Sequence, residues 1–319
     1  MRPAYLLANF GGPRHQKDVE NFLVSLLTDS CVTGNFLPPS LHKKLFSFIA
    51  RRRSPKVTLQ YLHIGGKSPI YQDTECLAKQ LEDRLLCPVI PFHRYLPDTH
   101  ETTLQSLSRL EENRQIIGVP MFPHFTYAVT GSIVKFFHTH AKKHNISWIA
   151  QFGNHPSYIS VMVKHIQQFL LTHEISNKDC CLLFSAHGLP LRYIRNGDPY
   201  DMQCEKSFKS LINNLGDMES YLCYQSKFGP GKWLQPSTKH ICKTLHTKKR
   251  NIIIIPFGFI SDHIETLYEI EEEYLPILDK RGYRALRLPA IYSSPLWIDY
   301  LIRIITGSPI TSYHNLIKT

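Results

Sequence analysis

The stretch Leu182-Leu183-Phe184-Ser185-Ala186-His187-Gly188-Leu189-Pro190 is an apolar run that ends abruptly in a histidine. Its first residues predict a short buried strand, and Gly188 and Pro190 predict the turn that ends it. His187 would then lie at the carboxyl end of a strand, where open α/β sheets place their ligand crevices. The sequence therefore predicts an α/β fold with His187 as a candidate functional residue.

A second stretch has the same design. Asn251 to Ile260 predicts a strand and a turn, and Ser261-Asp262-His263-Ile264-Glu265 then opens a helix. Two strand ends would thus present a histidine and a carboxylate. A site that carries protons and holds a divalent metal ion needs that pair.

Short apolar segments alternate with amphipathic segments along the whole chain. This alternation predicts parallel sheets with helices on both faces. Strands are expected at residues 5–8, 89–92, 116–120, 181–185, 221–225, 251–255 and 284–288, and helices at 19–27, 70–86, 99–113, 157–172, 200–214, 236–246, 263–275 and 295–306.

The chain also carries a faint internal duplication. Leu6 to Pro13 aligns with Leu183 to Pro190, which places Phe10 opposite His187, and Ile116 to Met121 resembles Ile252 to Phe257. We therefore expect two Rossmann-like parallel-sheet halves related by pseudo-duplication. The predicted domains are residues 1–148, residues 149–294 with His187 and Glu265, and a C-terminal helical segment, 295–319, that could pack on the first half.

The bulk composition fits a cytoplasmic protein of about two domains. The chain has 319 residues, 43% of them hydrophobic, which suffices for two cores at roughly 150 residues each. Its longest apolar stretch, Ile252 to Ile260, is far shorter than the ~20 residues of a membrane span. Tyr5 to Ala8 is too short for a signal peptide. The eight scattered cysteines form no CxxC pair and predict reduced thiols.

The net charge of +11 would suit an anionic partner. A lysine-rich composition without any charged partner explains it equally well. No nucleic-acid-binding module is recognisable, so nucleic acid is not an expected partner. The densest cluster, Arg51 to Arg53 with Lys43, Lys44 and Lys56, is short enough to clamp carboxylates on a small ligand. Peripheral contact of this basic cluster with a membrane surface is the alternative.

The helix that follows Asp262 carries four glutamates. Asp262 and Glu265 have the spacing of a capping box. At 3.6 residues per turn, Glu265, Glu269, Glu272 and Glu273 would lie within an arc of roughly 100°. This stripe predicts either a solvated face or a carboxylate ladder that lines a cleft and passes protons or cations.

The remaining motifs exclude several common activities. Tyr61 to Pro69 has the composition of a glycine-rich loop but lacks the P-loop order, and no GxSxG, HExxH or GxGxxG occurs. Phosphate-binding, hydrolase and nicotinamide-dependent functions are therefore weakly supported.

Taken together, the motifs resemble those of the ferrochelatases, which insert Fe²⁺ into a porphyrin to make haem. Leu182 to Pro190 match the family signature. That signature has two apolar residues, any residue, Ser, any residue, His, Gly or Ser, an apolar residue and Pro. The other matching segments are Asn9 to Pro13, Arg52 to Lys56, Tyr61 to Pro69, Arg94-Tyr95, Thr130 to Ser132, Asn196 to Tyr200, Gly229 to Leu234 and Ser261 to Glu269.

The resemblance implies a chelatase-like fold with a porphyrin cleft between the halves, and it implies roles for single residues. His187 and Glu265 would lie on opposite sides of the porphyrin centre as catalytic and metal-binding residues. Arg53, Tyr61 and Ser68 match porphyrin contacts, and Phe10 would approach the ring from the face opposite His187. The residues implied to support proton or metal transfer are His263, Glu269, Glu272 and Glu273.

The resemblance also suggests the substrates. Fe²⁺ would be a substrate, with no cofactor permanently bound. No iron–sulfur cluster is expected, because Tyr127 stands where some members carry the first cluster cysteine and no cysteine follows Cys242. Phe10 has no oxygen to ligate iron, which favours protoporphyrin IX over coproporphyrin III. The alternatives are a coproporphyrin ferrochelatase, a cobalt- or sirohydrochlorin-type chelatase and a non-enzymatic tetrapyrrole carrier.

Overall fold

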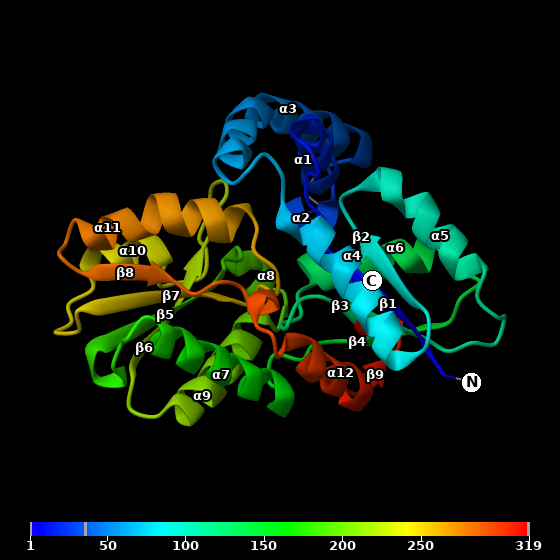
Figure 1. The fold of residues 1–319 in the computed structure, drawn as a ribbon. Coiled ribbons are helices and arrows are strands. Elements are labelled where there is room, and N and C mark those ends of the chain that lie inside the picture. The colour runs from blue at the N-terminus through cyan, green and yellow to red at the C-terminus, as the bar shows by residue number, and fades with distance from the viewer. Residues whose placement is uncertain (1, 35–36, 318–319) are drawn as a thin grey trace. The chain divides into compact units, whose positions relative to one another are not determined.

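The computed structural model describes residues 2–34 and 37–317, and the chain divides into two compact units (Figure 1). One unit takes in residues 1–151 and 305–319, and the other takes in residues 152–304. The chain returns to the first unit at Ile305, inside helix α12 (Trp297–Gly307).

The first unit is built on a five-stranded sheet with the order β2-β1-β3-β4-β9. Its strands are parallel except β9, which runs antiparallel to β4. The strands are β1 (Ala4–Asn9), β2 (Val89–His93), β3 (Ile116–Pro120), β4 (Ile146–Ile149) and β9 (Ile310–Thr311). The helices are α1 (Val19–Leu27), α2 (Ser30–Thr33), α3 (Pro39–His63), α4 (Pro69–Leu85), α5 (His100–Ser108), the π-helix Tyr127–Gly131 and α6 (Ser132–His140).

The second unit has a four-stranded parallel sheet with the order β6-β5-β7-β8. Helices α7 and α9 cover one face, and α10 and α11 the other (Figure 1). The strands are β5 (Cys180–His187), β6 (Glu219–Gln225), β7 (Asn251–Phe257) and β8 (Arg284–Arg287). The helices are α7 (Pro156–Thr172), α8 (Leu191–Arg195), α9 (Tyr200–Leu215), α10 (Thr238–Thr244), the π-helix Glu265–Tyr274 and α11 (Leu275–Asp279). Short 3₁₀ turns in the two units occupy Gln16–Asp18, Pro97–Thr99, Asn177–Asp179, Ile291–Ser293 and Tyr313–Asn315.

The two sheets confirm the predicted duplication, because β2-β1-β3-β4 and β6-β5-β7-β8 have the same strand order. The register agrees as well. Ala8 of β1 pairs with Pro120, and Ser185 of β5 pairs with Pro256. Two residues further along the chain come Phe10, directly after β1, and His187, the last residue of β5, so the two positions are equivalent in the two sheets.

Each predicted strand occurs, but several elements were not expected, namely β4, β9, α2, α3, the π-helix Tyr127–Gly131, α6 and α8. β4 has only four residues, Ile-Ser-Trp-Ile, too few to show a period. Helix α3 has apolar residues on more than one side, since Leu41, Phe48 and Leu59 are exposed while Phe46 and Tyr61 are buried, and Pro55 lies inside it. Because α3 runs to His63, Tyr61 belongs to its last turn, and the predicted glycine-rich loop begins only after it.

Both central strands lie in the cores of their units. Every residue of β1 is buried, as is every residue of β5 except His187. In the first core, Trp148 packs directly on Gly118 of β3, where a Cβ atom would meet the indole at 2.2 Å. Among the residues that the structure describes, no helix combines the length and the apolarity that crossing a membrane requires.

Candidate active site

His187 is the last residue of β5 and lies at the carboxyl edge of the second sheet. It is paired in register with Gln225, the last residue of β6. The next residue, Gly188, donates its N–H to the Gln225 carbonyl oxygen at 2.8 Å. A Cβ atom at Gly188 would lie 2.7 Å from that oxygen, so only glycine allows this close approach directly after the histidine.

Glu265 is the first residue of the π-helix that follows β7. The predicted capping box does not form. Asp262 instead accepts hydrogen bonds from the Thr266 hydroxyl and from Arg287, both at 2.7 Å. This leaves the Glu265 carboxylate free of a capping role, and it points to His187.

The imidazole of His187 and the carboxylate of Glu265 form a direct hydrogen bond. His187 Nδ1 lies 2.8 Å from Glu265 Oε2, and the two side chains are 38% and 28% exposed. The resemblance implied opposite sides of a ring centre, whereas the structure joins the two side chains in one pair. Because a carboxylate can only accept, Nδ1 carries the proton, and Nε2 of the neutral ring holds the lone pair.

This contact sets the protonation of both groups. Burial alone would lower the pKa of His187, but the charge of Glu265 and the hydrogen bond raise it above its ordinary value. Burial alone would raise the pKa of Glu265, but His187 and, to a smaller extent, His263 hold it well below its usual range. The pair is therefore an anionic carboxylate beside an imidazole made more basic.

Two of the predicted supporting residues adjoin the pair. His263 Nε2 lies 3.7 Å from Glu265 Oε2, and its buried Nδ1 has no hydrogen-bond partner in the described structure. Glu269 accepts hydrogen bonds from the N–H and the hydroxyl of Ser226, at 2.9 and 2.5 Å, and from the Tyr274 hydroxyl. Burial and the neighbouring Glu265 raise the pKa of Glu269.

The predicted arc of four glutamates has the wrong period. A π-helix is wider than an α-helix, with hydrogen bonds that span five residues. Its buried side chains recur every fourth position, at Thr266, Ile270 and Tyr274. Glu265, Glu269 and Glu273 follow the same spacing beside them, and Glu273 lies 3.6 Å from Lys239. Glu272 falls outside this row and is exposed.

In the first unit, Phe10 directly follows β1 and packs in an aromatic cluster. Its ring lies edge-on to Tyr95, Phe22 and Phe122, with centroids at 4.6, 6.1 and 6.4 Å. The side chain is only partly buried. It therefore forms an apolar surface at the carboxyl edge of this sheet.

The three predicted porphyrin contacts differ in their surroundings. Ser68 precedes α4 and is 2% exposed, and its Oγ has no hydrogen-bond partner among the described residues. It packs so tightly on the loop after β1 that a Cβ atom at Gly12 would lie 2.5 Å from the Ser68 Cβ. Tyr61 is buried in the last turn of α3, and Arg53 lies on an exposed part of that helix.

Sequence reasoning missed a buried network around Asp29. Its Oδ2 accepts hydrogen bonds from Arg94 at 2.9 Å, from the Tyr95 hydroxyl at 3.0 Å and from Ser132. Arg94-Tyr95 and Thr130 to Ser132 were motifs without an assigned role, and no pattern drew attention to Asp29. Since Tyr95 also packs on Phe10, the network supports the loop that follows β1.

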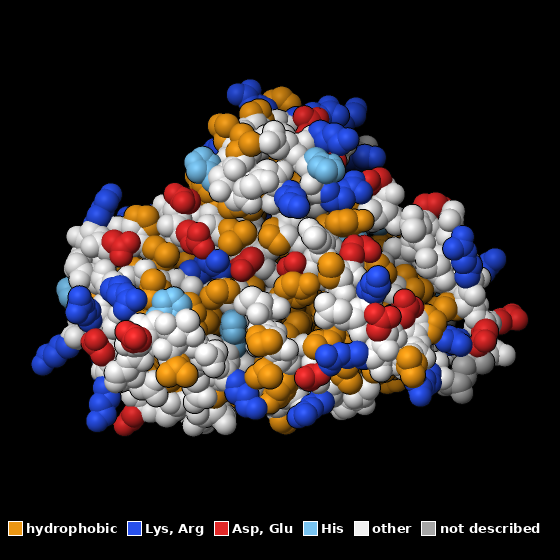
Figure 2. Space-filling model, in the orientation of Figure 1, with side chains coloured by type: hydrophobic (Ala, Val, Ile, Leu, Met, Phe, Trp, Pro, Cys, Tyr) orange, Lys and Arg blue, Asp and Glu red, His pale blue; other side chains and the backbone are white. Residues whose placement is uncertain are grey.

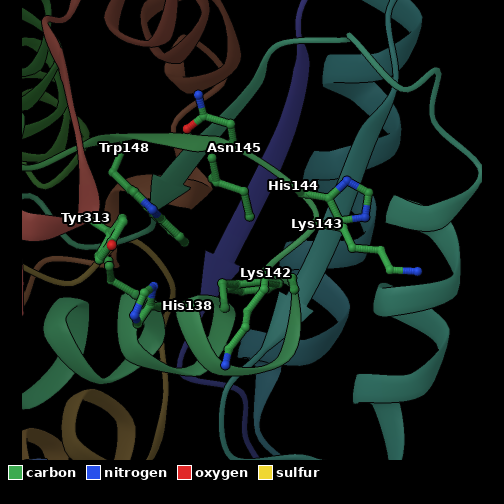
Figure 3. A pocket seen from close by; sticks show the side chains of 11 residues that line it. His138, Lys142, Lys143, His144, Asn145, Trp148 and Tyr313 are labelled. Carbon is green, nitrogen blue, oxygen red and sulfur yellow. The ribbon is translucent and has the colours of Figure 1, made fainter.

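A pocket of about 380 Å³ in the first unit contains none of the predicted site residues (Figure 3). Trp148, Tyr313, His138, Lys142 and Lys143 are among the residues that line it. It opens beside Ile146, where β4 begins, and thus at the amino edge of the sheet. Because the lysines directly follow α6, they are suited to interact with the carbonyl end of that helix.

No cluster of three or more potential metal-ligating side chains occurs in residues 2–34 and 37–317. The pair of His187 and Glu265, with His263 and Glu269 nearby, still offers one imidazole lone pair and one carboxylate. Mixed imidazole and carboxylate ligation suits a divalent iron ion held transiently. The same pair can accept a proton and stabilise the resulting imidazolium.

Comparisons with known proteins show which family the chain resembles. A sequence model described as Ferrochelatase matches residues 2–308. Proteins named Ferrochelatase from Chlamydia abortus and Chlamydia pneumoniae are 62% and 58% identical, over 100% and 99% of this chain and 100% and 97% of their own lengths. Among solved structures, SirB from Bacillus subtilis with Fe³⁺ is similar over 96% of each chain, with a TM-score of 0.56 at 13% identity. That likeness supports the fold, an α/β chelatase-like architecture.

Proposed function

This chain belongs to the ferrochelatase family, a family of lyases of haem biosynthesis, and we propose that it inserts Fe²⁺ into protoporphyrin IX to form protohaem. The observation that carries the proposal is the 2.8 Å contact between His187 and Glu265 at the carboxyl edge of the second sheet. The insertion replaces two pyrrole protons by one Fe²⁺, so the site must take up protons and must attract a cation. An imidazole and a carboxylate in contact supply both properties.

In the proposed reaction, His187 accepts the two pyrrole protons in turn at Nε2, because Nδ1 is held by Glu265, and it passes the first proton to solvent before it takes up the second. Glu265 raises the basicity of the ring and stabilises the imidazolium that forms. The same carboxylate attracts Fe²⁺, and Glu269 and Glu273 follow it at helical positions suited to carry protons or cations. His263 lies close enough to share the charge of Glu265.

The porphyrin contacts proposed for the first unit are Phe10, Arg53, Tyr61 and Ser68. A guanidinium suits a propionate, and an aromatic ring suits the face of the macrocycle. The buried Ser68 hydroxyl supports this assignment, since it has no hydrogen-bond partner in the described part of the chain. A porphyrin held in a distorted form would be closer to the transition state of insertion.

Protoporphyrin IX is the proposed porphyrin because Phe10 has no oxygen with which to ligate iron. The aromatic cluster of Phe10, Tyr95 and Phe122 is apolar and suits a ring with fewer carboxylates. Coproporphyrin III is the alternative. Parallel measurements of kcat/KM on the two porphyrins decide between them, and a tenfold preference for coproporphyrin III would overturn this choice.

We also propose that the protein binds no iron–sulfur cluster. Tyr127 packs edge-on against Phe125 at 4.9 Å in the position matched to a cluster cysteine. Six of the eight cysteines are buried, and burial raises the pKa of Cys181 and Cys242 and keeps both thiols protonated. Cluster absorbance in the visible region of anaerobically purified protein would refute this.

The proposed location is the cytoplasm, with peripheral contact to a membrane through α3. Figure 2 shows Lys and Arg side chains around this helix, with hydrophobic side chains between them. The exposed apolar residues are Leu41, Leu45, Phe48, Leu59 and Leu62. Such a surface suits an anionic bilayer. Co-sedimentation with anionic but not neutral vesicles, weakened by Phe48→Ser, is the expected result, and equal recovery with both would contradict it.

One assay separates the proposed function from its rivals. Purified protein is given Fe²⁺ and protoporphyrin IX without oxygen, and haem formation is followed. A ferrochelatase produces haem over many turnovers. A tetrapyrrole carrier binds the ring without turnover, and a cobalt- or sirohydrochlorin-type chelatase prefers another metal or ring.

A further inference from the structure

The residue at the centre of this inference is Gln225, which no sequence motif singled out. It ends β6, lies opposite His187 in the register of the second sheet and is 2% exposed. A buried amide needs partners for its donors and its acceptor.

The backbone of Gln225 fixes the His187 side of the pair. Its carbonyl oxygen accepts the Gly188 N–H at 2.8 Å, directly after the histidine. The end of β5 is therefore tied to the end of β6 at the catalytic position.

The side chain of Gln225 fixes the Glu265 side. Nε2 donates to the Glu265 backbone carbonyl at 2.9 Å, and Oε1 accepts from the Ser185 hydroxyl at 2.7 Å. Ser185 also contacts the Thr238 hydroxyl at 2.7 Å, and both of these side chains are fully buried. The amide is thus held at both of its ends, and its donor faces the first residue of the π-helix.

Only a side chain with a donor and an acceptor at this reach fulfils both roles. The Glu265 carbonyl can only accept, so a carboxylate in place of the amide would set two acceptors against each other. A thioether of similar size would leave the Ser185 hydroxyl and the carbonyl without this partner. Small displacements matter here, because a catalytic group misplaced by about 1 Å can cost about 10²-fold in rate.

We propose that Gln225 is a positioning residue that sets the distance between His187 and Glu265. Its backbone carbonyl holds Gly188, next to His187, and its side-chain amide holds the backbone carbonyl of Glu265. The inference rests on the proposed function, since it assigns Gln225 a part in metal insertion. Its neighbour Ser226, which binds Glu269 through its N–H and hydroxyl, extends the same support to the next carboxylate.

The test compares Gln225→Met and Gln225→Glu with wild type in anaerobic iron insertion. Both variants should lose about 10- to 100-fold in kcat while the porphyrin KM stays within about twofold, because the porphyrin contacts are unchanged. Ser185→Ala removes only the hydroxyl that donates to Gln225 Oε1, and its kcat should fall less than that of the two Gln225 variants. Ile254→Val in β7 is the matched control, since it lowers stability in the same sheet without touching the pair and should keep kcat.

The outcomes separate this inference from the proposed function. An unchanged kcat in folded Gln225→Met would overturn the positioning role alone. So would a fall of kcat in Ile254→Val equal to that in Gln225→Met, if the two variants lose the same amount of Tm. A wild-type protein that makes no haem would overturn the proposed function and the inference together. If Gln225→Met does not fold, Gln225→Asn takes its place, because its amide is one methylene too short to reach both partners and the same loss of kcat is expected.

Discussion

The ring of Tyr95 packs edge-on against Phe10, with centroids 4.6 Å apart. The Tyr95 hydroxyl donates to Asp29, which is 7% exposed and also binds Arg94. One buried carboxylate therefore anchors the aromatic side chain that supports Phe10. The position equivalent to His187 in the first unit is held by packing, whereas His187 itself is held by hydrogen bonds.

Asp29→Ala should lower the free energy of unfolding by about 3 kcal/mol, because it leaves Arg94 partly buried without its carboxylate. Urea denaturation measures the change. The matched control is Glu111→Ala, which breaks the exposed ion pair with Arg114 and should cost less than about 1 kcal/mol. Equal losses in the two variants would show that the Asp29 network contributes no special stability.

The pH dependence of turnover should report the contact between His187 and Glu265. His187 must be neutral to accept a proton, and Glu265 raises its pKa above 6.5, so kcat/KM should rise with pH through that raised value. In Glu265→Gln the carboxylate charge is gone while burial still lowers the pKa of His187, so the midpoint should move to lower pH. Glu271→Gln is the control. Glu271 is an exposed carboxylate paired with Arg287, and its substitution should leave the midpoint at the wild-type pH.

The wider period of the π-helix separates two neighbouring glutamates. Glu269→Gln should reduce kcat by about tenfold or more, within the range that proton-transfer groups contribute. Glu272→Gln should stay within about twofold of wild type, since Glu272 is exposed and lies outside the row of Glu265, Glu269 and Glu273. Similar losses in both variants would favour the four-glutamate arc that the 3.6-residue period predicted.

Arg53→Ala should raise the KM for porphyrin more than it lowers kcat, because a propionate contact stabilises the bound ground state as well as the transition state. Steady-state kinetics with varied porphyrin separates the two constants. Arg51→Ala is the comparison, since Arg51 lies on the same helix as Arg53 but is paired at 3.6 Å with Glu20 of α1. A fall in kcat at constant KM would show that Arg53 does not bind a propionate.

The strand ends could be predicted because their signals are local. Leu182 to Phe184 and Ile252 to Ile255 are short apolar runs followed by glycine or proline. They predicted the strand that ends at His187 and the strand that precedes the helix of Glu265. The contact between those two residues follows from the pairing of β5 with β7, which brings together positions 78 residues apart.

The missed features have no local signal of this kind. Helix α3 has apolar residues on its exposed side as well as on its buried side, and four residues of β4 cannot show alternation. Asp29 meets Arg94 and Ser132 across 65 and 103 residues, so no periodicity connects them. The π-helix was assigned the α-helical period, although the spacing of four between Glu265, Glu269 and Glu273 is compatible with a wider turn.

The most direct measurement is the rate of anaerobic Fe²⁺ insertion into protoporphyrin IX by His187→Ala, beside the wild type and with porphyrin binding followed by fluorescence. Removal of the proposed general base and metal ligand should abolish insertion, a loss of at least about 10²-fold, while porphyrin binding stays largely intact. Near-normal turnover in His187→Ala would contradict the assignment of the His187–Glu265 pair as the insertion site.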